Sequence, residues 1–155
     1  NFTAIYDKLT SLSPVPVEID ICPGEANGYF SSMENRIVLR PGMSQIQTVK
    51  TLVHEIAHAK LHDAKNIPPE ERKQRREKEV EAESIAYVVC QHFGIDTSEY
   101  SFGYVAGWSR GKEMNELKSS LDQIHSTAGE IIAALDDTCM VHTQVKSKPT
   151  PQFAR

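Results

Sequence analysis

The segment His54-Glu55-Ile56-Ala57-His58 constrains the fold of this chain more than any other. Residues four positions apart lie one turn apart on the same face of a helix, whereas in a strand they lie about 13 Å apart. The two histidines can therefore meet at one point only in a helix. The apolar residues around the segment predict that helix, because they recur at steps of three and four: Ile46, Val49, Leu52, Val53, Ile56 and Ala57. Ser44 is a suitable N-cap.

The two histidines lie at the edge of the apolar face of this helix. At about 100° per residue the apolar positions cover an arc of roughly 140°, and His54 and His58 fall just outside one edge. This position is typical of the wall of a cleft. Two imidazoles placed in this way can converge on one Zn²⁺, and Glu55 can act as general base on the water that the metal activates. The alternative is a pair of solvated histidines on a helix flank.

A catalytic zinc needs a third protein ligand, and the candidates lie further along the chain, in residues 77–86. The apolar face of this second helix is defined by residues at helical spacing: Ala82, Ile85, Ala86, Val89, Cys90 and Phe93. Glu79 and Glu83 fall on or beside that face, one turn apart, whereas Glu81 is expected to point well away. A buried acid is costly unless it is paired or binds a metal. We expect one of Glu79 and Glu83 to bind zinc and the other to orient a ligand histidine; pairing of both with Lys or Arg is the alternative.

The rest of the chain predicts a small antiparallel sheet followed by helices, which is an α+β domain. The expected elements are a short helix over 3–12, strands at 17–21, 28–30 and 37–40, a second helix from Pro68 to Phe93, and a long third helix over 114–135. We expect one domain over residues 1–140 and a flexible tail or linker over 141–155, where proline and polar residues gather. The chain begins with Asn1 rather than Met, so we expect it to be processed or cut from a longer protein.

Charge and composition argue against several classes of protein. The chain has 155 residues, with 17 Lys plus Arg against 21 Asp plus Glu and a net charge of −4. This balance argues against a chain that coats nucleic acid by charge alone. No run approaches the roughly 18 apolar residues of a membrane span. Cys22, Cys90 and Cys139 are widely spaced and form no Cys-x-x-Cys pair, so we expect free thiols in the cytoplasm.

The two helices together resemble a known family of metallopeptidases. His54–His58 followed by Glu79-Val80-Glu81-Ala82-Glu83-Ser84-Ile85-Ala86 resembles the ImmA/IrrE family, whose pattern is HExxH and then a second helix reading ExxANxFA. The resemblance implies that Glu79 is the third zinc ligand, which leaves Glu83 to orient a ligand histidine. The sequence departs from the pattern at Glu83, where the family often has Asn, and at Ile85, where it has Phe.

A second resemblance extends further along the chain. Residues 79–95, followed by Tyr104-Val105-Ala106-Gly107-Trp108, look like the C-terminal domain of ArdC-type antirestriction proteins. Those proteins have a similar helix, a Tyr-Ile-Ala-Gly-Trp segment and a long final helix. The resemblance implies a zincin-like fold in a protein of a mobile element, joined to other domains of a larger polypeptide. Contact with nucleic acid is then expected from another domain rather than from this one alone.

The expected function is hydrolysis of a peptide bond in a peptide or protein substrate. Zn²⁺ would be held by His54, His58 and Glu79, and Glu55 would take a proton from the attacking water. A strand around 37–39 would hold an extended peptide by edge pairing, and Tyr104 could donate to the developing oxyanion. The alternative is a non-catalytic, zinc-stabilised module of an antirestriction or DNA-processing protein.

Two further features are expected to have no part in this chemistry. His62 continues the histidine series by one more turn and is expected at the surface or at the lip of the cleft. A group of basic residues is expected to form a solvated helix face laced with ion pairs: Arg72, Lys73, Arg75, Arg76 and Lys78.

Overall fold

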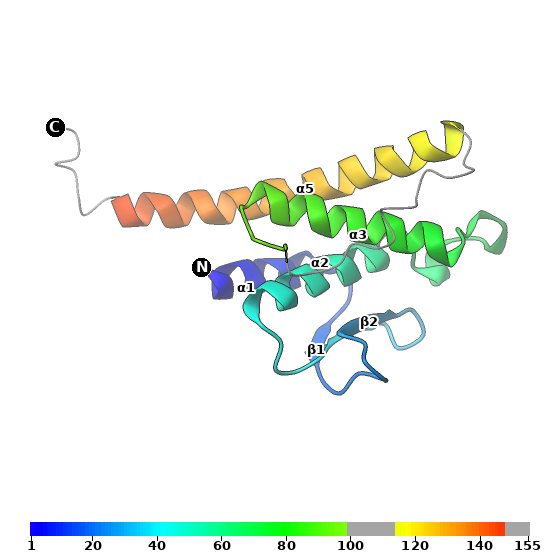
Figure 1. Ribbon diagram of the computed structural model, residues 1–155, viewed down its shortest axis with the longest axis horizontal. Coiled ribbons are helices and arrows are strands. Elements are labelled where there is room, and N and C mark those ends of the chain that lie inside the picture. The colour runs from blue at the N-terminus through cyan, green and yellow to red at the C-terminus, as the bar shows by residue number, and fades with distance from the viewer. Residues whose placement is uncertain (99–113, 148–155) are drawn as a thin grey trace.

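The computed structural model describes residues 1–98 and 114–147, with side chains for 1–98 and 114–137 (Figure 1). The regular elements follow one another as α1 (Phe2–Leu12), β1 (Val17–Ile19), β2 (Gly28–Ser31), β3 (Arg36–Leu39), α2 (Gln45–Leu61), α3 (Arg75–His92) and α5 (Met114–Ser147). Figure 1 shows α1 and α2 between the small sheet and the helices α3 and α5. The α+β class expected from the sequence is confirmed.

Helix α2 is fixed at its start by a cap and along its length by burial. The Ser44 hydroxyl accepts a hydrogen bond from the Gln47 backbone N–H at 3.1 Å, as an N-cap does. Leu52, Val53 and Ile56 are fully buried in the core. Burial of each such side chain contributes about 1.5–3 kcal/mol relative to exposure. The helix that contains residues 54–58 is therefore held by its apolar face against the rest of the core.

The sheet is mixed, so the predicted antiparallel sheet is wrong. Strand β3 lies in the centre, antiparallel to β2 and parallel to β1, with Val17 opposite Ile37. The cause is the distribution of apolar residues. Residues 37–39 (Ile-Val-Leu) are all buried and take the central place, where a strand is covered on both faces. Strand β1, which alternates apolar and acidic residues, pairs with β3 at the edge instead of with β2.

Helix α3 begins later than the sequence predicts. Pro68-Pro69 starts only a short 3₁₀ turn, Pro69–Glu71, and α3 itself begins at Arg75. The Arg72 guanidinium donates to the carbonyl oxygens of Ile67 at 3.1 Å and Ala64 at 2.9 Å. These bonds tie the turn back to the connection after α2, so the chain is extended at Arg72 before the helix begins.

Helix α5 covers the face of the domain that lies away from the sheet. It packs against α3 and α1 and buries Ile124, Ala128, Ile131 and Leu135. None of the helices in the described ranges is both long enough and apolar enough to cross a membrane. Residues 148–155 lie outside the described part, and the boundary expected at residue 140 stays a prediction.

Gly28 has little room for a side chain, so we expect a larger residue at this position to destabilise the fold. A Cβ there would lie 2.8 Å from Thr51 Cγ2 and 2.9 Å from the Val38 carbonyl oxygen. Gly28→Ala should therefore lower the free energy of unfolding by about 1–3 kcal/mol, because a backbone atom must move. Gly129→Ala is the matched control: nothing lies within 4 Å of its Cβ in α5, and the same change should raise that free energy by about 0.5–1 kcal/mol. Urea titration measures both, and equal effects would contradict the packing described.

Candidate metal centre

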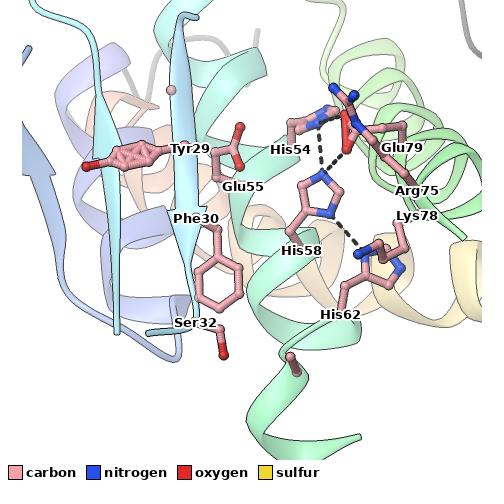
Figure 2. A pocket seen from close by; sticks show the side chains of 12 residues that line it. Tyr29, Phe30, Ser32, His54, Glu55, His58, His62, Arg75, Lys78 and Glu79 are labelled. Atoms are coloured by element: carbon pink, nitrogen blue, oxygen red, sulfur yellow. Dashed lines mark hydrogen bonds and ion pairs between the residues drawn. The ribbon is translucent and has the colours of Figure 1, made fainter. Parts of the chain in front are cut away.

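A cleft of about 480 Å³ opens between strand β2 and helices α2 and α3 (Figure 2). Strand β2 contributes Gly28, Tyr29 and Phe30 to one wall. The opposite side is polar and comes from the two helices: His54, Glu55, His58 and His62 around α2, and Arg75, Lys78 and Glu79 from α3. The cleft therefore has an extended backbone on one side and titratable side chains on the other.

Three of the predicted site residues converge in this cleft. His54 and His58 point in the same direction from α2, and their Nε2 atoms lie 3.2 Å apart. Glu79 reaches them from α3, with Oε1 at 3.3 Å from His54 Nε2 and Oε2 at 2.7 Å from His58 Nε2. One ligand atom from each residue lies within 4.8 Å of the others. The packing of α2 against α3 thus brings together His54 and Glu79, which are 25 positions apart in the sequence.

This geometry fits a tetrahedral ion. Ligand atoms at about 2.0–2.1 Å from a tetrahedral zinc are about 3.3 Å from one another. The separations of 3.2 and 3.3 Å between the histidines and from His54 to Glu79 match this spacing. The 2.7 Å separation from His58 to Glu79 would have to lengthen slightly. Two imidazole nitrogens and one carboxylate also form a donor set that catalytic zinc sites use.

The electrostatics of Glu79 favour its charged form. Burial would raise the pKa of this carboxyl, but hydrogen bonds and charge from His54 and His58 outweigh the burial and hold the pKa well below its ordinary value. Glu79 is therefore a carboxylate at neutral pH, which is the form that binds a metal ion.

Glu55 lies beside the three convergent residues in a different environment. It is buried, and burial raises its pKa to about 7; His54 opposes the shift while the Glu79 charge adds to it. A backbone hydrogen bond from Phe30 in β2 also favours the charged form. Glu55 can thus take up or release a proton near neutral pH, as a general base must.

Two further glutamates of α3, Glu81 and Glu83, are buried. Glu83 is buried one turn beyond Glu79, and the described lining of the cleft does not include it; its role in orienting a histidine stays a prediction. Glu81 was expected to point well away from the buried face that carries Glu79 and Glu83, yet it is 0% exposed. The reason is that α3 packs against α2 on one side and α5 on another, so more than one of its faces is buried.

His62 lines the cleft, which fits one of its two expected positions, but His62 and Lys73 are both less exposed than a surface position implies. The His62 side chain is 4% exposed, with its Nε2 at 2.7 Å from Glu81 Oε1. Burial lowers the pKa of His62, and the hydrogen bond with Glu81 opposes this only in part. Lys73, expected on a solvated helix face, forms an ion pair with Glu81 before α3 begins. The four-residue spacing of His54, His58 and His62 indicates that His62 lies on the same side of the helix as His58, and the two side chains are in contact. Tyr104 lies outside the described residues.

The chain is similar to a known protein family over about half of its length. Residues 22–103 match the IrrE N-terminal-like domain, peptidase family M78. An uncharacterized protein of Bacillus anthracis is 36% identical over 107 residues, which cover 65% of this chain and 17% of that protein. The chain thus matches only about a sixth of this relative. No solved structure matches, and the closer relationship to ArdC-type proteins stays a prediction.

The family match covers more than half of the chain and includes the whole of α2 and α3, which carry His54, His58 and Glu79. The chain therefore belongs to the IrrE N-terminal-like domain family.

Proposed function

We propose that this domain is a zinc-dependent metallopeptidase that hydrolyses a peptide bond. The observation that carries the proposal is the convergence of His54, His58 and Glu79 in a cleft beside the buried Glu55. Membership of a peptidase family supports the same reaction. A bound Zn²⁺ would polarise the carbonyl of the scissile bond and lower the pKa of a water molecule.

Glu55 supplies the proton transfers that peptide hydrolysis needs. As a carboxylate it accepts a proton from the attacking water at one of its oxygens, while the water oxygen bonds to the carbonyl carbon. It then donates that proton to the amide nitrogen as the carbon–nitrogen bond breaks, so the base is regenerated. Burial raises the pKa of Glu55 to about 7 in the metal-free cleft, and the charge of a bound Zn²⁺ would lower it from there, which favours the carboxylate that accepts the first proton.

Strand β2, rather than the strand expected from the sequence, would hold the substrate. Residues 37–39 belong to β3, which is paired on both sides, so the expected edge pairing there is wrong. Strand β2 pairs only with β3 in the described sheet, and Gly28, Tyr29 and Phe30 line the cleft. An extended peptide can add to that edge through main-chain hydrogen bonds, which places its backbone in the cleft opposite α2.

Zinc binding tests the site directly. The wild-type chain should bind one Zn²⁺, and His58→Ala and Glu79→Gln should each lose stoichiometric zinc because a ligand is gone. At a free zinc concentration of 100 Kd, the free energy of unfolding of the wild type should rise by about 2.7 kcal/mol. Metal analysis and urea titration with and without zinc measure the two effects.

A control for that experiment is His92→Ala. His92 lies at the end of α3 and pairs with Asp136 at 3.3 Å, away from the cleft lining. This variant should bind zinc as the wild type does. Equal zinc content in His58→Ala and His92→Ala would rule out the site.

Catalysis is tested by Glu55→Gln, which keeps the size of the side chain and removes its basicity. Zinc content should be unchanged, and hydrolysis of a peptide library should fall by about 10²–10⁴-fold, the usual contribution of a general base. Mass spectrometry of the cleaved library measures the rate. Zinc binding by the wild type without any cleavage would favour the alternative function, a non-catalytic zinc-stabilised module.

A further inference from the structure

A continuous series of partly buried polar contacts leads from His58, in the cleft, through His62 to Glu81. His58 Nδ1 lies 2.9 Å from His62 Nδ1, and His62 Nε2 lies 2.7 Å from Glu81 Oε1. Figure 2 shows the first of these contacts on the side of His58 that faces away from His54 and Glu79. The two ring nitrogens of His58 thus have separate partners: Nε2 faces the proposed ligands and Nδ1 faces His62.

The series of polar contacts ends at Glu81, whose carboxylate is fully buried. Such a charge is costly to bury unless hydrogen bonds surround it. Besides His62, it accepts a hydrogen bond from Ser120 Oγ of α5 at 2.7 Å and pairs with the Lys73 ammonium. Lys73 also donates to Gln123 Oε1 at 3.4 Å. Three donors therefore hold Glu81 in its charged form, in which it can only accept hydrogen bonds.

Because Glu81 can only accept, it determines which nitrogens of His62 and His58 carry a proton. Because Glu81 accepts, His62 must donate from Nε2–H. A neutral His62 then has a lone pair on Nδ1, which accepts from His58 Nδ1–H. In the absence of metal, the proton between His58 Nε2 and Glu79 lies on the cleft side of the ring. When zinc takes the place of that proton, a His58 that donates from Nδ1 presents the lone pair of Nε2 to the metal. A doubly protonated His62 would give the opposite result, because it would donate to His58 Nδ1 and force the proton of His58 onto Nε2.

We propose that His62 and Glu81 are positioning residues that hold His58 in the tautomer required for zinc binding. The inference rests on the proposed metal site. A metal-binding histidine is commonly held by a carboxylate at its other nitrogen, which fixes the ring and raises its basicity. Here a second imidazole stands between the carboxylate and the ligand, and residues from before α3 and from α5 hold the carboxylate in place.

The first test is zinc affinity in His62→Phe, which keeps an aromatic ring and removes both hydrogen bonds. The zinc Kd, measured by competition with a chromophoric chelator, should rise by about 10–100-fold, the usual cost of losing such a partner. His92→Phe is the matched control, because His92 pairs with Asp136 outside the cleft lining; its Kd should equal that of the wild type. A folded His62→Phe variant with the Kd of the wild type would overturn the proposal.

The second test needs no variant and remains decisive if His62→Phe fails to fold. In the zinc-loaded wild type, ¹⁵N NMR of the imidazole nitrogens should show His58 protonated at Nδ1, and His62 protonated at Nε2 and unprotonated at Nδ1. A doubly protonated His62, or one with its proton on Nδ1, would overturn the proposal. If His62 and Glu81 only stabilised the fold, they would not determine which nitrogens of His58 and His62 are protonated.

The two tests separate this inference from the proposed function. If the wild type binds no zinc, the metal site itself is wrong and the inference fails with it. If the wild type binds zinc but His62 has the other protonation pattern, only the inference fails. The expected NMR pattern together with the weaker zinc binding of His62→Phe would support both.

Discussion

The packing of α2 against α3 is the constraint on which the site depends. Both proposed histidine ligands come from α2 and the carboxylate comes from α3, so the three atoms meet only in one register of the two helices. A shift of α3 by one turn would move Glu79 by about 5.4 Å, which exceeds every separation between the three residues. Ala57 in α2 and Ala82 and Ala86 in α3 are buried. Such small side chains allow helix backbones to approach closely.

Three glutamates around this interface have three different environments, although their side chains are identical. Glu55 is buried without a cationic partner close enough to offset the burial, and its pKa rises. Glu79 faces two imidazoles and Glu81 faces an imidazole, an ammonium and a hydroxyl, so both pKa values fall. Groups whose environments separate their pKa values take different chemical roles. Here Glu55 is the candidate proton acceptor and Glu79 is the candidate metal ligand. Glu81 is the buried carboxylate that we propose to orient His58 through His62.

The sequence predicts the parts of this arrangement that depend on local periodicity. The cap at Ser44 and the apolar repeat locate α2, and helical phase brings Glu79 toward the same interface. Glu81 was misplaced because a helical wheel assigns one buried face, whereas α3 is covered by both α2 and α5. The burial of His62, at the end of α2, depends on its contact with Glu81 of α3, which the pattern of α2 alone cannot indicate. The pairing of β1 with β3 was missed for a related reason. A strand's partner depends on contacts between distant segments, and residues 17–21 carry no local sign of the parallel neighbour.

Ser120 has a consequence for the limits of the domain. It lies in α5, beyond residues 22–103 that the family match covers, and yet its hydroxyl donates to Glu81. A fragment that ended with the matched residues would retain every proposed ligand and lose both this donor and the apolar cover that Ile131 and Leu135 give to the core. The core of the described structure therefore extends beyond the residues that the family match covers, because α5 supplies part of it.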